Sequence, residues 1–265
     1  MMRLGFPVID IHTHLRNNIP LHTKIAKENG IDVVIYMANC SPPLDSLKTI
    51  KKSLKEKRYC KAIPVSAITK NLEGKELVDI DRIKPYVAGF SDDGKCLYNL
   101  EILEFTLKKN VLALVHLEPE TEILKKYLDV YDKTGGHLHF QHISKRESIN
   151  LIRLAKKNGL KITCETCPHY FAYSKEDLDV KVSPPLGVKE DVLAIKEGLS
   201  DGTIDVIASD YAPLPRKTGI AGFRSFLPFS YGLVLEGVLT ENQLKEKLFL
   251  NPKKIIEKGG YKIKI

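Results

Sequence analysis

The stretch VIDIHTHLR spans residues Val8 to Arg16, and its apolar start leads into His12 and His14, set two positions apart. In a β-strand, residues i and i+2 lie on the same face, so both imidazoles would project together from the carboxyl end of the strand. This arrangement offers two ligands to one metal ion. Because an HxH pair also arises by chance in ordinary strands, the rest of the chain has to decide its meaning.

The composition indicates a globular protein with one large domain. The chain has 265 residues, of which 43% are hydrophobic and 28% are charged, and such a length suits a single α/β barrel. We therefore expect one domain over residues 1–265. The sequence has neither a long apolar stretch nor an initial basic segment followed by an apolar run and a cleavage site. We expect no membrane span and no secretion signal.

The net charge of +8 comes from lysines scattered over the chain rather than from one basic block. A nucleic-acid surface would cluster basic residues with aromatic ones, so we expect a solvated surface, no nucleic acid, and a field that favours a small anionic substrate. The five cysteines lack disulfide-type spacing, which favours a reducing cytoplasm. The lone CxxC of Cys164 and Cys167, and His169 just after it, are expected to be structural.

Short β-branched runs alternate with helical patterns along nearly the whole chain. The expected strands are 8–11, 32–37, 61–68, 86–90, 112–116, 137–143, 160–165 and 205–209. The expected helices, where apolar residues recur every three or four positions, are 44–57, 100–109, 120–134, 146–159 and 189–202. This alternation predicts a closed parallel (β/α)8 barrel of the TIM type. An open doubly wound sheet would need a phosphate-binding loop, and neither GxGxxG nor GxxxxGK[ST] occurs in the sequence.

Side chains that bind metals recur where the expected strands end. They are His12, His14, Asp93, His116, His142 and Asp210. The carboxyl ends of barrel strands converge on the face where active sites lie, so these six side chains would meet in one mouth. Four histidines and two carboxylates suit one or two divalent ions of the zinc type, with two favoured and one carboxylate able to bridge them.

Three histidines fall within one expected strand, in the segment HLHFQH. By strand alternation, His142 shares a face with Leu138 and Phe140, whereas the other two histidines take the opposite face. We expect His142 to enter the mouth because it ends the strand. His137 and His139 are expected to pack or to form hydrogen bonds.

Together, these motifs resemble those of the dihydroorotase family of cyclic amidohydrolases, from Val8 to about Pro228. The resemblance is carried by DIHTHLR (10–16), MANCSPP (37–43), GFSDDG (89–94), VHLEP (115–119), HLHFQHIS (137–144), ETCPHYF (165–171), KVSPPL (181–186) and DVIASDYAP (205–213). It implies a zinc-dependent, reversible hydrolysis of dihydroorotate to N-carbamoyl-L-aspartate in pyrimidine biosynthesis.

Carried over position by position, the resemblance implies that His12 and His14 bind a first metal and that His116 and His142 bind a second. Many relatives bridge the two ions with a carboxylated lysine. The FSDDG form resembles those that use an aspartate instead, and Asp93 is the expected bridge.

The resemblance also implies roles on the substrate side of the site. Asp210 would contact the first metal and act as general base, while Arg16 and Asn39 would hold the substrate carboxylate. An arginine fork suits that task because it forms bidentate, charge-assisted hydrogen bonds. Whether Asp92 or Asp93 bridges the metals is left open by the sequence.

Several positions on the substrate side depart from the family pattern. The family usually has asparagine in place of Ser183, arginine in place of Gly187 and glutamate in place of Arg224. It usually has histidine in place of both Tyr211 and Leu214. We also expect no flanking β-sandwich and no EPG-containing stretch after HLR.

Two interpretations remain. One is an active short dihydroorotase, or a hydrolase of another cyclic amide such as a hydantoin, in which Arg224 restores a positive contact. The other is a metal-binding but catalytically weak partner subunit, for instance of aspartate transcarbamoylase; a homo-oligomer is also possible from the sequence. The six retained ligand candidates favour the enzyme, because clustered histidines and acids are costly to bury without a ligand.

Overall fold

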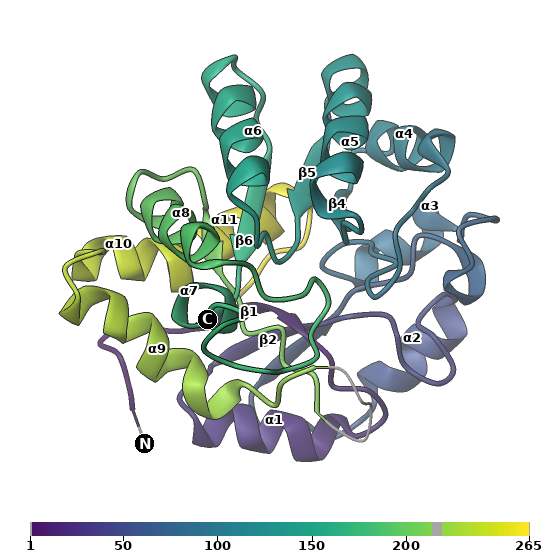
Figure 1. The fold of residues 1–265 in the computed structure, drawn as a ribbon. Helices are drawn as coiled ribbons and strands as arrows, with labels where there is room; N and C mark the ends of the chain where they lie inside the picture. Colours follow the sequence, from purple (N-terminus) through teal and green to yellow (C-terminus); the bar gives the residue numbers. More distant parts are fainter. Residues whose placement is uncertain (1, 214–218, 265) are drawn as a thin grey trace.

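The computed structural model describes residues 2–213 and 219–264, which form parallel strands surrounded by helices (Figure 1). The strands in these ranges are β1 (Ile9–Thr13), β2 (Val33–Tyr36), β3 (Lys61–Pro64), β4 (Leu112–Val115), β5 (His137–Phe140), β6 (Thr163–Thr166) and β7 (Val206–Ile207). They pair in the order β1-β2-β3 and β4-β5-β6-β7, and all the pairs are parallel. Sequence neighbours are therefore also neighbours in space, as repeated βα units require.

Two short segments join these sheets into a closed barrel. Phe90 forms parallel bridges to Ser66, just after β3, and to Ala113 in β4, so it stands in the place of the expected strand 86–90. Tyr211 makes the other joint, because its carbonyl accepts the backbone N–H of His14 at 2.7 Å. The expected (β/α)8 barrel is confirmed, although its fourth strand is much shorter than predicted.

Helices cover the outside of the barrel. Those in the described ranges are α1 (Ile19–Glu28), α2 (Leu47–Leu54), α3 (Ile80–Ile83), α4 (Leu100–Lys108), α5 (Glu120–Thr134), α6 (Arg146–Lys157), α7 (Pro168–Ala172), α8 (Lys189–Ser200), α9 (Phe223–Leu235), α10 (Glu241–Lys245) and α11 (Asn251–Lys258). Short 3-10 turns lie at Lys70–Leu72 and Lys84–Tyr86, and a π-helix at Glu246–Leu250 joins α10 to α11. Within the described ranges, none of the helices combines the length and apolar character needed to cross a membrane.

All five predicted helices are present, as α2, α4, α5, α6 and α8. The sequence analysis did not predict α1 or α9. Helix α1 does carry a start signal, because the Asn18 side chain accepts the backbone N–H of Leu21 and Pro20 lies in the first turn. Helix α9 contains Pro228. Proline lacks a backbone N–H and disrupts the interior of a helix, so the sequence pattern does not predict a helix there.

Two apolar layers hold the barrel together. Inside it, alternate strand residues such as Ile9, Val33 and Leu112 form a core that also includes Ile255 and Ile256 of α11. A larger layer lies between the strands and the outer helices. These apolar side chains fill the barrel interior away from the carboxyl ends of the strands. The polar side chains of the strands gather at the carboxyl ends.

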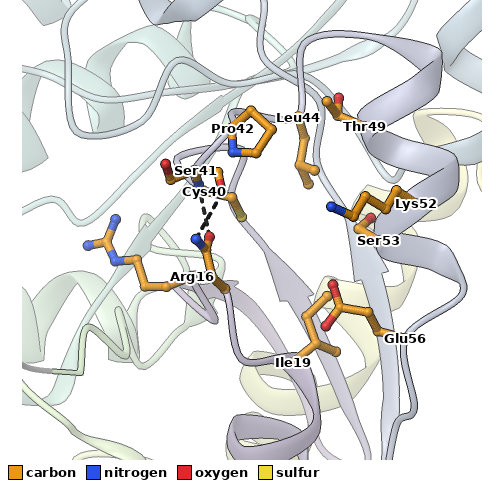
Figure 2. A pocket seen from close by; sticks show the side chains of 11 residues that line it. Arg16, Ile19, Cys40, Ser41, Pro42, Leu44, Thr49, Lys52, Ser53 and Glu56 are labelled. Atoms are coloured by element: carbon orange, nitrogen blue, oxygen red, sulfur yellow. Dashed lines mark hydrogen bonds between the residues drawn. The ribbon is translucent and has the colours of Figure 1, made fainter.

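Loops at this end are tied to one another. Asn17 and Ser41 exchange two hydrogen bonds of 2.9 Å, which connect the loop after β1 to the loop after β2 (Figure 2). Beside them lies a cavity of about 210 Å³, lined in part by Lys52 and Glu56 of α2. The stem of Arg16 lines the same cavity, and its guanidinium points away from Lys52 (Figure 2). The loop pairing therefore fixes the backbone from which Arg16 reaches toward the barrel mouth.

Candidate metal centre

Two groups of three side chains gather at the mouth, and within each the possible ligand atoms lie within 4.8 Å of one another. The first group is His12, His14 and Asp210. The second group is Asp93, His116 and His142. His12 lies in β1 and the other five follow β1, β4, β5, β7 and Phe90, so barrel closure is what brings these six residues together. All six lie where the sequence analysis expected them to converge.

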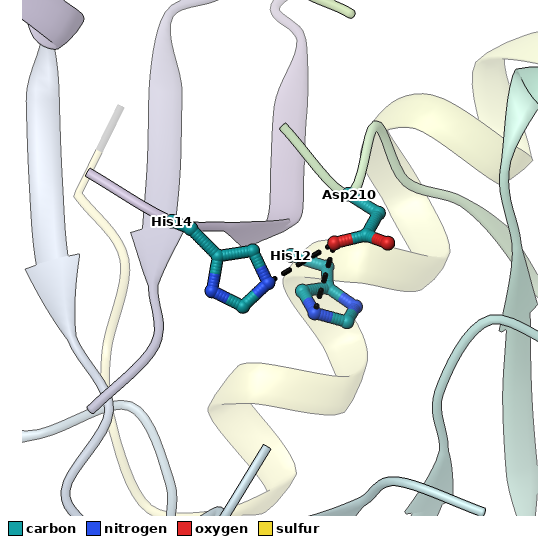
Figure 3. Close-up of side chains that lie close together, drawn as sticks. All are labelled: His12, His14 and Asp210. Carbon is teal, nitrogen blue, oxygen red and sulfur yellow. Dashed lines mark hydrogen bonds and ion pairs between the residues drawn. The ribbon is translucent and has the colours of Figure 1, made fainter. Parts of the chain in front are cut away.

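In the first group, both imidazoles turn toward one carboxylate (Figure 3). The Asp210 Oδ1 atom lies 3.0 Å from His14 Nε2 and 3.6 Å from His12 Nε2. Burial raises the pKa of the Asp210 carboxyl, but the charge of His12 and the contacts with His14 outweigh burial and hold that pKa well below its usual range. Asp210 is therefore an ionised carboxylate that faces two imidazole nitrogens.

Asp93 lies between the two groups and turns one oxygen to each. Its Oδ2 is 3.2 Å from His14 Nε2 and 3.5 Å from His12 Nε2. Its Oδ1 is 3.6 Å from both His116 Nδ1 and His142 Nε2. This Oδ1 is buried and has no hydrogen-bond partner among the described residues. A buried carboxylate oxygen without a partner is costly, and a cation would offset that cost, so the donor set fits a pair of divalent ions.

Asp92, its neighbour, has a different environment. One Asp92 oxygen accepts the backbone N–H groups of Ile68 and Thr69 at 2.8 and 3.0 Å, and the other accepts the Thr69 hydroxyl. These contacts use the carboxylate to hold the loop after β3. Of the two adjacent aspartates, Asp93 is the one that faces the histidines.

A buried carboxylate and a half-buried amide hold the ring nitrogens of the first group that face away from it. His12 Nδ1 lies 2.5 Å from Glu165 Oε1, and His14 Nδ1 lies 2.9 Å from Asn39 Oδ1. The second oxygen of Glu165 lies 3.1 Å from His139 Nε2. Carboxylate and amide partners of this kind fix the orientation of metal-binding imidazoles.

Glu165 was not assigned a role by the sequence analysis. Burial raises the pKa of its carboxyl, but the charges of His12 and His139 outweigh burial and lower the pKa to about 2. One feature of the sequence could have indicated this role. Glu165 ends the mostly apolar expected strand 160–165, and a carboxylate buried there needs a charged or hydrogen-bonding partner.

The predicted faces of the histidines near β5 were wrong. His139 and His142 were expected on opposite faces, yet His139 contacts Glu165 and His142 contacts Asp93, so both point into the barrel. Strand β5 ends at Phe140, and His142 has a φ of 37°. This left-handed backbone turns the side chain inward, because face alternation applies only while the strand continues.

Three residues at this mouth have a strained backbone. Arg16, His142 and Asp210 all have positive φ, at 54°, 37° and 45°. Residues other than glycine avoid this region, and such strain persists only where the surrounding structure holds it, most often at functional sites. Three expected site residues therefore share a conformation that no sequence pattern indicates.

A cavity of about 240 Å³ opens onto both groups. Arg16 and Asn39, the expected substrate-binding residues, both line it. The Arg16 guanidinium donates a hydrogen bond of 3.2 Å to the Asn39 carbonyl. The Asn39 amide nitrogen donates to the Asp93 carbonyl at 3.3 Å, while its oxygen contacts His14. Asn39 thus supports the first group as well as lining the cavity.

Two of the positions that depart from the family pattern, Ser183 and Gly187, make local contacts that suit the residue present. Ser183 lines the cavity and donates to Glu118 Oε2 at 2.9 Å. Gly187 packs against Asp191, where an added Cβ would lie only 2.4 Å from a carboxylate oxygen. Arg224 is exposed on α9 and is not part of the cavity lining within the described residues. Leu214 lies outside the described residues.

Cys167 and His169 lie close enough to Asp210 to form a third set of possible ligands. His169 is buried, and burial lowers the pKa of its imidazole to about 4. Burial likewise raises the pKa of the Cys167 thiol well above its ordinary value. Both side chains are therefore neutral at neutral pH, and like the other four cysteines Cys167 forms no disulfide.

Known proteins resemble this chain in sequence and in fold. No family model matches the chain. The chain is 32% identical over 312 residues to a dihydroorotase from Endomicrobium trichonymphae, an alignment that covers 96% of this chain and 74% of the relative. It is also 32% identical over 307 residues to a dihydroorotase from Acetivibrio thermocellus, with 94% and 72% covered.

Two solved structures resemble the barrel. An L-hydantoinase from Arthrobacter aurescens has a TM-score of 0.84 at 20% identity, over 94% of this chain and 70% of that one. The inactive dihydroorotase-like domain of a CAD-like multifunctional protein from Chaetomium thermophilum has a TM-score of 0.76 at 21% identity, over 94% and 79%. At these identities the likeness concerns the fold alone.

Proposed function

Since the chain belongs to the dihydroorotase family, we propose that it is a metal-dependent cyclic amide hydrolase that converts dihydroorotate reversibly to N-carbamoyl-L-aspartate. The reaction belongs to de novo pyrimidine biosynthesis, which fits a cytoplasmic protein. The observation that carries the proposal is Asp93, whose two buried oxygens face two separate pairs of imidazole nitrogens.

The proposed metal centre holds two zinc ions. The residues that would hold the first ion are His12, His14, Asp93 and Asp210. The residues that would hold the second are Asp93, His116 and His142. When bound, the ions would polarise the ring carbonyl and lower the pKa of a water molecule toward neutrality.

Asp210 is the proposed general base. It is ionised, it faces the catalytic cavity, and it lies 3.0 Å from His14 Nε2. In ring opening, Asp210 would accept a proton from the attacking water and return it to the ring nitrogen that leaves. In the reverse direction, the same carboxylate would take the proton from the nitrogen that attacks and return it to the oxygen that leaves as water when the ring closes.

Arg16 is proposed to select the substrate. Dihydroorotate carries a carboxylate outside the amide that reacts, and a guanidinium pairs with a carboxylate through two parallel hydrogen bonds. A plain hydantoin ring lacks this carboxylate. Arg16 therefore favours dihydroorotate over hydantoin, the alternative substrate.

The test is the rate of dihydroorotate ring opening, followed by ultraviolet absorbance, in zinc-loaded protein and in Asp210→Asn. We expect turnover in the wild type and a loss of about 10²–10⁴-fold in the variant. Arg16→Lys should raise KM for dihydroorotate without improving hydantoin hydrolysis. A wild type that binds zinc but opens no ring would contradict the proposal. Co-elution with aspartate transcarbamoylase would then support the partner-subunit alternative.

A further inference from the structure

His22 and Tyr211 form a buried pair beside the first group. His22 lies on α1, and its Nδ1 atom is 2.9 Å from the Tyr211 hydroxyl. Their rings meet edge to face with centroids 5.4 Å apart, and the two residues are 8% and 3% exposed. This contact joins an outer helix to the segment that closes the barrel.

The ring of Tyr211 is also held from α9. Phe223 stacks on it with a centroid separation of 3.7 Å and an angle of 2° between the ring planes. A hydrogen bond at the hydroxyl and stacking on the ring leave the Tyr211 side chain little freedom. Two helices therefore determine where residue 211 lies.

The backbone of Tyr211 connects two members of the first group. Tyr211 follows Asp210 directly, and its carbonyl accepts the His14 N–H at 2.7 Å. Its own N–H donates to the Ser209 hydroxyl at 3.0 Å. Any displacement of Tyr211 would change the distance between the Asp210 carboxylate and the His14 imidazole.

Asp210 needs such support because its backbone is strained. Its φ of 45° lies in the left-handed region, which costs free energy for any residue other than glycine, although less for aspartate than for most, so neighbouring contacts help to hold it. The side-chain contacts of Tyr211 act on this segment from α1 and α9, outside the mouth.

We propose that His22 and Tyr211 are positioning residues which, through the backbone of Tyr211, hold Asp210 and His14 in the geometry that binds one metal ion. The inference rests on the proposed function only in taking the first group to be a metal site.

The pair acts through geometry rather than through charge. Burial lowers the pKa of the His22 imidazole and raises that of the Tyr211 hydroxyl to about 12. Both groups are therefore neutral near neutral pH. Neither places a charge beside the metal site.

The test uses the full chain loaded with Co²⁺. Tyr211→Phe removes the hydroxyl but keeps the stacked ring, and His22→Leu removes the same hydrogen bond from the side of α1. We expect each variant to bind one of two cobalt ions about tenfold more weakly in chelator competition. The visible cobalt spectrum should change, and kcat should fall while KM for dihydroorotate stays the same.

Tyr127→Phe is the matched control. Its buried hydroxyl bonds to the backbone N–H and carbonyl of Leu97, both at 3.0 Å, away from the two groups. It should leave cobalt affinity and spectrum unchanged. The double variant should bind cobalt no more weakly than His22→Leu alone, because that variant has already lost the hydrogen bond that Tyr211→Phe removes.

Wild-type cobalt affinity and spectrum in Tyr211→Phe and His22→Leu would overturn the inference. An equal loss in Tyr127→Phe would also overturn it, because the effect would then be general destabilisation. The proposed function is judged separately: a wild type that binds cobalt without opening dihydroorotate contradicts the enzyme and leaves the positioning test in force. If the wild type binds no cobalt, both are wrong.

Discussion

The first and second groups contain the same number of ligand atoms but differ in what lies behind them. In the first, Glu165 holds His12 and Asn39 holds His14, at 2.5 and 2.9 Å. In the second, His142 Nδ1 is buried without a hydrogen-bond partner in the described part of the chain. Among the described residues, His116 Nε2 contacts only Glu118, at 3.4 Å, and the Glu118 side chain is 57% exposed.

This difference shows that the number of ligand atoms does not by itself determine how tightly a site binds its metal ion. An imidazole held by a buried carboxylate binds metal without having to be oriented first, whereas an unsupported one loses freedom on binding. We therefore expect the first group to hold its ion more tightly than the second.

The largest expected effect comes from Asp93, the carboxylate that the two groups share. Asp93→Asn should lower the metal content of both groups and reduce activity by more than the roughly 100-fold that loss of an outer partner causes. Metal content is measured by atomic emission spectroscopy and activity by ring opening.

Asp92→Asn is its control. This variant should keep both ions and lower the free energy of unfolding by about 1–3 kcal/mol, because it weakens the bonds to Ile68 and Thr69. Loss of metal from Asp92→Asn alone would assign the bridge to Asp92.

Removing the support of the first group should have the next largest effect. Glu165→Gln keeps the shape of the side chain but removes the charge beside His12, and should weaken metal binding at one site by about 10–100-fold. Chelator competition measures the change. Glu120→Gln is a matched variant, since Glu120 is also buried but bonds to Ser144 and Lys145 instead. If both variants lost metal affinity equally, Glu165 would have no specific role in supporting the first group.

Metal removal should proceed in two steps. The ion of the second group should leave first, about tenfold faster, because its imidazoles have weaker support. A colorimetric chelator follows the release, and His142→Asn should abolish the fast phase while His14→Asn abolishes the slow one. Simultaneous release of both ions would contradict the difference between the groups.

The metal-free protein should have a distinctive pH dependence. Burial opposes charging of His12, but Asp93 and Glu165 outweigh burial and raise its pKa above 6.5. The resulting stability is present below pH 6.5 and is lost as the pH rises through the folded-state pKa. The Glu165 pKa falls from 4.5 to about 2, so its contribution is present above pH 4.5 and is lost as the pH falls toward 2.

Metal-free protein should thus be most stable to urea between about pH 4.5 and 6.5. Metal-loaded protein should instead lose stability below pH 6.5, because protons compete for the imidazoles. His12→Asn should flatten the upper arm of the metal-free profile. Parallel profiles with and without metal would show that His12 is not a ligand.

The smallest effect is expected at Glu118. Its side chain is more than half exposed, so Glu118→Ala should change metal affinity of the second group by less than about fivefold. Chelator competition again provides the measurement. An effect as large as that of Glu165→Gln would mean that the second group is supported as firmly as the first.

Much of the barrel was predictable because the apolar periodicity of each strand and helix lies within its own short stretch of sequence. Residues 120–134 form α5 as predicted, and β2 lies within the expected strand 32–37. The fourth strand was predicted at 86–90 but is reduced to Phe90. Gly89 allows this close approach, since an added Cβ would lie 2.8 Å from the Leu112 carbonyl. Steric limits from a neighbouring strand leave no trace in local pattern.

By itself, the sequence determined the barrel and predicted the six side chains that converge at its mouth, because periodicity and strand ends are local properties of the chain. Only the tertiary structure decided which aspartate faces both pairs of histidines, that His142 turns inward, and that Glu165 and Asn39 support one group alone. These features depend on separations of a few ångströms between residues far apart in the sequence. Such distances are determined only when the barrel closes.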